Sequence, residues 1–346
     1  MSGAARTEPR IEPRRALERW MARQELTVHE VEELFGRLVD GEIDEPVKAA
    51  LLVALTMKGE SPAEIAGAAR AMRARVRRVP HARERVVDTC GTGGDGAGTF
   101  NISTLAALVA AAAGAAVAKH GNRAVSSRSG SADLLMALGV EVEQPPERAG
   151  ALLERVGLAF LFAPCFHPAM REVMPVRRAL GVRTVFNLLG PLTNPAGATR
   201  QLLGVFARDR VELLARVLAE LGTEHALVVH GADGLDEITT TGPTRVAEVR
   251  GDRVELWELV PEDLGLTRVR AEALAGGTPE ENAAIARRIL AGEPGPRAEI
   301  VALNAAAALH VAGRVPDLAT GLALARETLG SGAAAAKLAE LREGGA

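Results

Sequence analysis

The sequence predicts an α/β protein with a small all-helical domain and a larger domain whose mostly parallel sheet is flanked by helices. Two observations lead to this fold class. The first eighty residues carry helix signals throughout, whereas short β-branched runs alternate with helical stretches from Val86 onward. A length of 346 residues is sufficient to bury full cores in two domains.

Capping signals predict three helices in the N-terminal region. Thr27–Glu30 forms a capping box, and Ser61 begins a second one before a proline. Between them, Asp44 precedes a helix that extends from Pro46 to Lys58. This middle helix is apolar almost all round from Val47 to Leu55, so we expect it to be buried against its own chain or against a partner.

The segment from Arg70 to Arg85 is strongly basic and marks the end of the helical region. Glu84 is its only acid, and Pro80 interrupts it. Such a cluster fits a solvated helix face that leads into a linker better than it fits a nucleic-acid patch. We therefore place a domain boundary near residue 80.

The elements of the larger domain follow from alternating apolar runs and turn residues. A hairpin is expected around Gly251-Asp252, Thr278–Glu281 caps a helix, and a buried helix is expected from Glu299 to Ala312. The expected strands, in chain order, are Val86–Asp88, Ala116–Ala118, Phe160–Phe162, Gly204–Phe206, Ala226–Val229, Val246–Val249 and Val254–Glu258.

Three polar loops lie close together at positions where α/β folds bind anions. They run from Asp88 to Thr104, from Lys119 to Arg123 and from Ser126 to Asp133. An apolar stretch precedes the first two, and helical sequence follows the first and third. Because this order directs backbone N–H groups and a helix dipole at one place, the loops predict a phosphorylated, polyanionic ligand.

Two common nucleotide sites are disfavoured. Gly91, Gly93 and Gly96 satisfy G-x-G-x-x-G, but that fingerprint requires an acid about 20 residues further on to hold the ribose hydroxyls. The next strand end carries Lys119 and His120 instead, which argues against NAD. No Gly-Lys-Ser/Thr follows the glycines, so the loop is not a Walker loop.

Composition narrows the class further. The net charge of −3 provides no broad basic field for nucleic acid. Cys90 and Cys165 are the only cysteines and form no C-x-x-C, so neither a disulfide framework nor a zinc site is expected. Met1–Arg15 reads as a flexible arm rather than a signal peptide, and the apolar runs are too short to span a bilayer. We expect a cytoplasmic protein without membrane or nucleic-acid partners.

Lysine is rare in this chain. Among 41 basic residues only Lys48, Lys58, Lys119 and Lys337 are lysines. A compact ammonium acts as a point charge toward phosphate, whereas a guanidinium is wide and planar. Lys119 at a strand end therefore indicates a phosphate contact.

An acidic pair provides a candidate metal site. Asp236 and Glu237 follow the apolar run Leu227–Val229 and a turn at Asp233-Gly234. Adjacent acids at the carboxyl end of a strand fit Mg²⁺ held through carboxylates, waters and ligand phosphates. Two acids in a loop are common and would not by themselves indicate a metal. The phosphate loops favour the metal site, because polyphosphate ligands bring Mg²⁺ with them.

Two other segments remain open on the residues alone. The arginines that begin at Arg177, before a Gly-Pro-rich turn, suit either a substrate carboxylate or ordinary surface pairing. His167 is a lone histidine, which is more often structural than catalytic.

Together these strings resemble the anthranilate phosphoribosyltransferases, which join anthranilate to phosphoribosyl pyrophosphate (PRPP) in tryptophan biosynthesis. The resemblance covers about residues 15–340 in consistent order, without a departure at a motif position. It rests on Gly91-Thr92-Gly93-Gly94-Asp95, Asn101–Thr104, Lys119–Arg123, Gly130–Asp133, Phe186–Pro195 and Asp233–Glu237.

The resemblance implies the organisation of the chain. Residues 1–80 with 168–194 would form a helical domain that makes a homodimer, and residues 81–167 with 195–346 would form the PRPP-binding α/β domain. A dimer through the helical domain would account for the apolar helix at Val47–Leu55.

The resemblance also implies the site residues. Mg²⁺ would be held by Ser103, Asp236 and Glu237, and anthranilate would meet Gly91, His120, Asn122 and Arg177. PRPP would be held by Gly91, Gly94, Asp95, Thr99, Asn101, Ile102, Ser103, Thr104, Lys119, Ser127 and Ser131.

The reaction expected is displacement of pyrophosphate from ribose C1 by the aryl amine. That amine is neutral at pH 7, so we assign no general base. Catalysis then consists of orientation and stabilisation of the leaving anion.

Two rival functions are considered. A pyrimidine nucleoside phosphorylase of the same broad fold needs one phosphate and no Mg²⁺, which would leave Asp236-Glu237 idle. A non-catalytic relative that binds nucleic acid through Arg70–Arg85 predicts damaged substrate motifs, whereas these are whole.

Overall fold

The computed structural model describes residues 10–124 and 128–344. The chain divides into a helical unit, Met1–Val76 with Pro168–Leu189, and an α/β unit, Arg77–His167 with Gly190–Ala346. Residues 77–80 and 190–194, expected in the helical domain, thus belong to the α/β unit. The reason is local, because Val79 N donates a 3.0 Å hydrogen bond to the backbone oxygen of Pro195.

Capping organises the helical unit largely as expected. The capping boxes at Thr27 and Ser61 are both formed. Asp44 occupies an N-cap position, but its side chain makes no capping hydrogen bond, and the first helix begins at Pro13, inside the expected flexible arm. The elements are α1 (Pro13–Met21), α2 (Val28–Val39), α3 (Glu45–Lys58), α4 (Pro62–Arg73), η1 (Pro168–Glu172), α9 (Met174–Leu180) and α10 (Phe186–Leu189).

The later segment of the helical unit is bonded to the N-terminal helices. Lys48 on α3 is buried, and its Nζ donates a 2.9 Å hydrogen bond to the backbone oxygen of Glu172. The ring of Phe35 on α2 packs against that of Phe186, with centroids 5.8 Å apart. These contacts account for the assignment of residues 168–189 to this unit.

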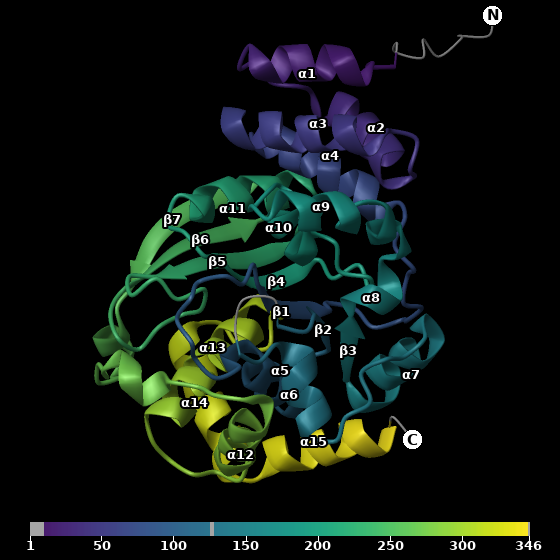
Figure 1. Cartoon of the computed structure of the whole chain (residues 1–346). Helices are drawn as coiled ribbons and strands as arrows, with labels where there is room; N and C mark the ends of the chain where they lie inside the picture. The colour runs from purple at the N-terminus through teal and green to yellow at the C-terminus, as the bar shows by residue number, and fades with distance from the viewer. Residues whose placement is uncertain (1–9, 125–127, 345–346) are drawn as a thin grey trace, which may run out of the picture. The chain divides into compact units, whose positions relative to one another are not determined.

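The α/β unit contains one seven-stranded sheet in the order β3-β2-β1-β4-β5-β6-β7 (Figure 1). Strands β1 to β5 run parallel, and the expected hairpin forms the antiparallel edge β6-β7. The strands are β1 (Val87–Gly91), β2 (Val117–Gly121), β3 (Leu158–Phe162), β4 (Arg200–Gly204), β5 (His225–Gly231), β6 (Thr244–Arg250) and β7 (Arg253–Leu259).

Strand β4 differs from its expected position at Gly204–Phe206. It ends at Gly204 instead of beginning there. Its first residues, Arg200 and Gln201, are polar, yet Gln201 is buried because its amide donates a 2.7 Å hydrogen bond to Pro191 O. A polar residue satisfied in this way conceals the strand from a hydrophobicity pattern.

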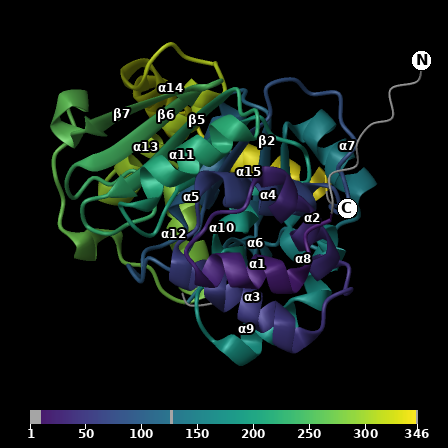
Figure 2. The same ribbon diagram turned by 90° about the horizontal axis from the view of Figure 1, so that it is seen from above.

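Helices cover both faces of the sheet. Helix α5 connects β1 to β2, and α11 connects β4 to β5 in the opposite direction along the sheet. Because both crossovers are right-handed, the two helices lie on opposite faces of the sheet (Figures 1 and 2). The remaining bounds of the unit are α5 (Ile102–Ala112), α6 (Ser131–Ala137), α7 (Pro146–Val156), α8 (Ala163–Phe166), η2 (Gly190–Leu192), α11 (Arg210–Glu220), η3 (Pro261–Leu264), η4 (Ala271–Leu274), α12 (Pro279–Leu290), α13 (Pro296–Val311), α14 (Leu318–Gly330) and α15 (Ala333–Gly344).

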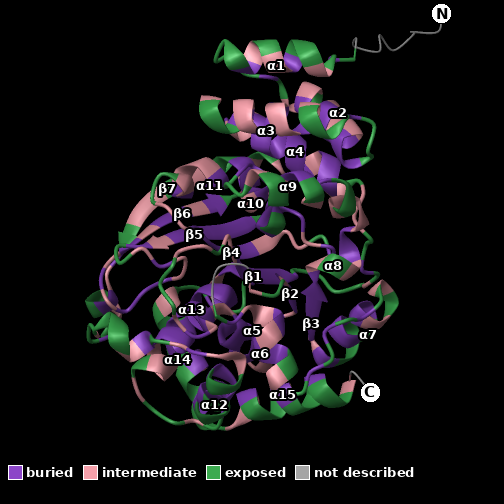
Figure 3. Ribbon diagram, in the orientation of Figure 1, coloured by how far each residue is buried: buried purple, intermediate pink, exposed green. Residues whose placement is uncertain are grey.

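The core lies between the sheet and these helices. Strand β3 is buried along its whole length, and α5 and α13 are buried on nearly every face (Figure 3). The helix expected from Glu299 to Ala312 is confirmed as α13. Within the two described stretches, no helix is both long and apolar enough to cross a bilayer.

The topology fixes where a ligand can bind. The chain leaves β1 toward β2 on one side and leaves β4 toward β5 on the other, so the strand order reverses between β1 and β4. In open α/β sheets the crevice at the carboxyl ends of such strands is the ligand site. Here these ends are Gly91 and Gly204, which are paired in register.

Candidate active site

The loop after β5 folds back over the carboxyl ends of β1 and β4, and two glycines allow this approach. A Cβ atom on Gly204 would lie 1.5 Å from the backbone oxygen of Asp236, and one on Gly91 would lie 2.3 Å from Asp236 Oδ2. Any side chain at either strand end would displace the loop. The two glycines therefore bring the acidic pair to the first polar loop.

Asp236 and Glu237 accept hydrogen bonds from that loop and from the helix behind it. Gly93 N donates to Asp236 Oδ2 over 2.8 Å, and Ser103 N donates to Glu237 Oε1 over 3.0 Å. Both side chains keep partial exposure, so a ligand can reach them.

The two carboxyls resist ionisation. Burial and the neighbouring Asp95 carboxyl raise the pKa of Asp236, while burial and Asp236 raise the pKa of Glu237. Because the negative charges oppose one another, a cation placed among them would be stabilised. With the hydroxyl of Ser103, these groups form an all-oxygen donor set of the kind that suits Mg²⁺.

Lys119 is buried beneath the first loop. Its ammonium donates to the backbone oxygen of Thr89 and lies 3.3 Å from Ser103 Oγ. The positive charge partly opposes the rise in the pKa of Glu237 that burial causes. Lys119 therefore lies next to the acidic pair, and the phosphate contact that the sequence suggests stays a prediction.

Asp88 joins the carboxyl ends of neighbouring strands. Its Oδ1 accepts a 3.0 Å hydrogen bond from His120 N, and its Oδ2 accepts a 2.8 Å hydrogen bond from Asn194 Nδ2. Burial raises the pKa of Asp88 to about 6, although Lys119 and these donors oppose the shift. The Asn194 amide also donates to Ala118 O over 2.8 Å, so the Gly-Pro-rich turn is attached to β1 and β2.

His120 and His167 form a buried pair. Their Nε2 atoms are 3.1 Å apart, and His120 Nδ1 lies 3.1 Å from the backbone oxygen of Gly190. Since a carbonyl only accepts, His120 carries its proton on Nδ1 and accepts from His167 at Nε2. Burial lowers the pKa of His120 to about 3 and that of His167 to about 4, so both rings are neutral at pH 7.

The first and third polar loops are bonded to each other and to α12. Asn101 Nδ2 donates to Ser129 O over 3.0 Å, and Asn101 Oδ1 accepts from Asn282 Nδ2 over 3.0 Å. In the first turn of α6, Asp133 Oδ2 accepts from Gly130 N over 2.9 Å. These bonds hold the loops beside the N-terminus of α5.

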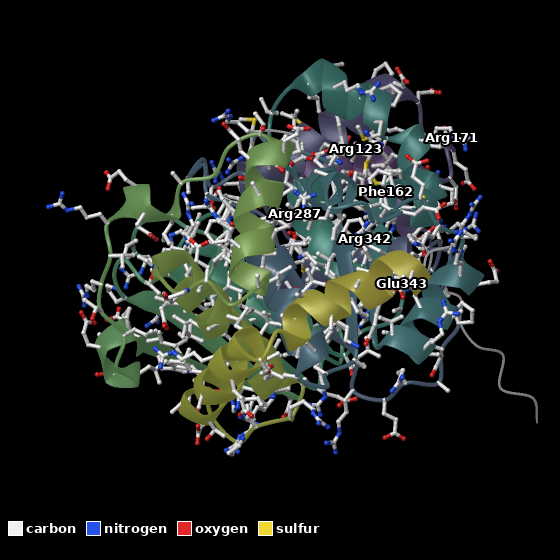
Figure 4. The ribbon with its side chains drawn as sticks, turned by 90° about the horizontal axis from the view of Figure 1, so that it is seen from below. Arg123, Phe162, Arg171, Arg287, Arg342 and Glu343 are labelled. Carbon is white, nitrogen blue, oxygen red and sulfur yellow. The ribbon has the colours of Figure 1, made fainter. Side chains whose placement is uncertain are left out.

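The second loop is held by its arginine. The guanidinium of Arg123 stacks on the ring of Phe162, with its carbon 5.6 Å from the ring centroid, and the two residues are labelled together in Figure 4. Arg123 N also donates to Asn122 Oδ1 over 2.8 Å. Asn122 is exposed and therefore accessible to a ligand.

The structure places the other expected residues unequally. Gly91, Gly94, Asp95 and Thr99 are half-exposed around the first loop, and Ser131 Oγ lies 3.3 Å from Asn122 O. The side chains of Ile102 and Thr104 are buried, so only their backbone can meet a ligand. Ser127 lies outside the described residues. Arg177 belongs to the helical unit, where its guanidinium carbon lies 5.6 Å from the ring centroid of Phe186.

Comparisons with known proteins agree with this geometry. Residues 83–335 match the model of the glycosyl transferase family a/b domain, and residues 14–76 match that of its helical bundle domain. The anthranilate phosphoribosyltransferase from Symbiobacterium thermophilum is 53% identical over 92% of this chain and 94% of its own. The one from Rubrobacter xylanophilus is also 53% identical, over 94% of this chain and 95% of its own. The chain belongs to the anthranilate phosphoribosyltransferases of the glycosyl transferase family.

Solved anthranilate phosphoribosyltransferases share the fold. The enzyme from Thermus thermophilus is 53% identical, covers 95% of this chain and 98% of its own, and superposes with a TM-score of 0.90. The Saccharomyces cerevisiae enzyme in complex with PRPP and Mg is 26% identical with a TM-score of 0.87, over 96% of this chain and 97% of its own.

Four residues of this anthranilate phosphoribosyltransferase site were missed on sequence. Asp88 reads as the end of a strand, Asn194 as part of a turn, and Asn282 as an ordinary helix position, while His167 was taken as structural. All four act through contacts with residues distant in the chain. Only Asp88 had a local signal, as an acid inside an otherwise apolar strand.

Proposed function

We propose that the chain transfers the phosphoribosyl group of PRPP to the amine of anthranilate, releasing pyrophosphate, with Mg²⁺ held at the acidic pair. One observation carries the proposal: Gly91 and Gly204 allow Asp236 to sit against the loop that would hold the phosphates. The names of the similar enzymes, and the PRPP and Mg of the yeast complex, support it.

The phosphates of PRPP would bind to the polar loops and the N-terminus of α5. The proposed contacts are the backbone N–H groups of the loop glycines, together with Asn101 and Ser131, which the loop hydrogen bonds already orient. Gly94, Asp95 and Thr99 line the same loop, and the backbones of Ile102 and Thr104 begin the helix. Lys119 would act through Ser103 and Glu237.

Ser103, Asp236 and Glu237 would hold the metal. Their donors are all oxygens. Burial and, second, a neighbouring carboxyl raise the pKa of each acid, and a divalent cation bound between them would offset both effects. When bound there, Mg²⁺ supplies stabilisation for the charge that grows on the departing pyrophosphate.

Anthranilate would meet Gly91, His120, Asn122 and Arg177. Both ring nitrogens of His120 are engaged, so its part is to present a neutral, oriented ring rather than to exchange a proton. The partly buried guanidinium of Arg177 fits the anthranilate carboxylate, and burial lowers its pKa without removing its charge.

The reaction needs no strong base, because the aryl amine is already a neutral nucleophile. The loops orient ribose C1 toward it, and the backbone N–H groups stabilise the leaving anion. The ortho-carboxylate of anthranilate would accept the amine proton as the C–N bond forms.

The test follows loss of anthranilate fluorescence with PRPP across Mg²⁺ concentrations. D236N/E237Q keeps the size of both side chains but removes their charge, so we expect most turnover to be lost and part of it to return at high Mg²⁺. Overlapping curves of activity against Mg²⁺ concentration for wild type and variant would show that Asp236 and Glu237 do not hold the metal. Phosphorolysis of thymidine without metal would then favour the nucleoside phosphorylase.

A homodimer through the helical unit and a cytoplasmic location complete the proposal. Support for the dimer comes from one face of α3, where Val47, Ala50 and Ala54 stay half-exposed and Met57 is exposed. Their spacing of three and four residues makes a continuous apolar stripe, which suits a partner helix.

A further inference from the structure

A second cluster of metal-ligand side chains lies at the amino-terminal end of β5, whereas the candidate active site lies at the carboxyl ends of the parallel strands. His225 begins β5, Glu248 lies on β6, and His310 lies in the last turn of α13. The antiparallel register pairs His225 with Arg250, so Glu248, two residues before Arg250, projects from the same face. Two consecutive strands and a helix from much later in the chain thus converge here.

The nitrogen and oxygen atoms of the cluster face one another. His225 Nε2 lies 2.9 Å and His310 Nε2 lies 3.7 Å from Glu248 Oε1. All three ligand atoms lie within 4.8 Å of one another. Tetrahedral zinc with bonds of about 2.0–2.2 Å separates its ligand atoms by about 3.3–3.6 Å, so small side-chain movements would close the site.

The surroundings favour a cation. The side chains of His225, Glu248 and His310 are 6%, 16% and 12% exposed, and the carboxyl end of the α13 dipole points toward the cluster. His225 Nε2 donates to Glu248 Oε1 over 2.9 Å, so a zinc ion bound at this nitrogen would replace the proton that the carboxylate now accepts. His310 Nδ1 is buried without a hydrogen-bond partner in the described chain, so no bond at that atom fixes the ring.

We propose that His225, Glu248 and His310 form a zinc-binding site, with water as the fourth ligand, that ties β5 and β6 to α13. Histidine nitrogen and carboxylate oxygen are both common zinc ligands, and three protein ligands with one open position is an established arrangement. The site is independent of the proposed transferase reaction. It departs from the expectation that the chain holds no zinc site, because that expectation rested on the cysteines and this site uses neither of them.

Arg250 competes with the metal. Its Nη2 lies 2.6 Å from Glu248 Oε1 and 3.2 Å from His310 Nε2, where its charge occupies the position of the cation. The Arg250 side chain is 57% exposed, so it can turn into solvent when zinc enters. Removing this charge therefore tightens zinc binding if the site is real. In a purely structural ion network, it would only weaken the network.

The experiment uses tag-free full-length protein, stripped with a chelator and kept in excess Mg²⁺ so that the acidic pair at the active site is occupied. Zinc binding is measured by calorimetry and by metal content after gel filtration, and Co²⁺ is added as a spectroscopic probe of tetrahedral coordination. We compare wild type with H310Q, E248Q and R250Q. H29Q, which removes an exposed histidine on α2, is the matched control.

Wild type and H29Q should bind one zinc equivalent that H310Q and E248Q lose, a drop of more than about 100-fold, since even outer-shell partners cost 10–100-fold. R250Q should bind severalfold tighter, and zinc should raise the melting temperature of wild type but not of H310Q. Equal binding by wild type, H310Q and E248Q would overturn the proposal. If both variants misfold, R250Q decides, because unchanged or weaker binding in R250Q contradicts the site.

Discussion

Lys119 is a buried positive charge next to the acidic pair of the candidate site. Its side chain is 4% exposed, and its ammonium lies between Thr89 O and Ser103 Oγ, close enough to influence Glu237. An ammonium in this position balances carboxylates that would otherwise repel one another. The shape of the cavity around it should therefore matter as much as its charge.

We expect K119A to weaken PRPP binding by about 1.5–3 kcal/mol, since a charge-assisted contact is lost. K119R should recover little of this, because a planar guanidinium does not fit the space of an ammonium. Isothermal titration with PRPP and Mg²⁺ measures the effect, and K337R on α15 serves as the control for a lysine outside the site. Wild-type affinity in K119R would show that the fit is unimportant.

His167 provides a pH-dependent measurement at the same scale. Burial lowers its pKa to about 4, below the ordinary value of 6.5. Such a histidine favours folding fully above pH 6.5, and the unfolded chain gains protons first as the pH falls toward 4. Stability is therefore lost over this window.

Glutamine does not titrate, so H167Q lacks this pH-dependent contribution to stability. We expect it to destabilise the α/β unit less at pH 5 than at pH 7, by a difference of about 1–2 kcal/mol in the free energy of unfolding. Urea denaturation of wild type and H167Q at both pH values measures the difference. A constant difference between the two proteins would mean that His167 is not held neutral.

At the scale of elements, the end of β4 controls the position of the acidic loop. In G204A the new methyl would lie 1.5 Å from Asp236 O, so the loop must move. We expect a loss of about 1–3 kcal/mol in stability and loss of most Mg²⁺-dependent activity, measured by thermal unfolding and by the fluorescence assay. The control is G330A at the end of α14, where nothing lies within 4 Å of a new Cβ. It should lower neither the stability nor the Mg²⁺-dependent activity. Full activity in G204A would contradict this role.

Elements with local signals were predictable from the sequence. The capping boxes at Thr27, Ser61 and Thr278 and the hairpin at Gly251-Asp252 depend on residues within four positions of one another, and all are confirmed. Strand β4 was misplaced because its first two residues, Arg200 and the buried Gln201, are polar. A local sequence pattern predicts the local structure it forms. A buried polar residue that is hydrogen-bonded to a distant partner cannot be told from a surface residue in the sequence.

The same division holds for the candidate site. Glycine loops and the acidic pair stand out in the sequence because phosphate and metal binding require those residue types. The tie from Asp88 to Asn194 joins positions more than a hundred residues apart, as does the bond from Asn101 to Asn282. No local pattern links Asp88 to Asn194 or Asn101 to Asn282, so only the folded chain reveals these pairs.

At the scale of the whole molecule, the apolar stripe on α3 predicts the oligomeric state. Met57 is 74% exposed, and a charge there would be desolvated in a partner interface. We expect wild type to sediment as a dimer and M57E as a monomer at micromolar concentration. M136E on α6 of the α/β unit is the control and should remain dimeric. A monomeric wild type, or a dimeric M57E, would contradict the proposed interface.

The helical unit is discontinuous in the chain, and this has a consequence for synthesis on the ribosome. Lys48 and Phe35 find their partners Glu172 and Phe186 only after 96 and 110 further residues beyond Val76 have been translated. At 5–20 residues per second this takes about 5–20 seconds. During that interval the nascent N-terminal helices expose apolar surface that only the later segment covers, so they are a natural binding target for chaperones at the ribosome exit.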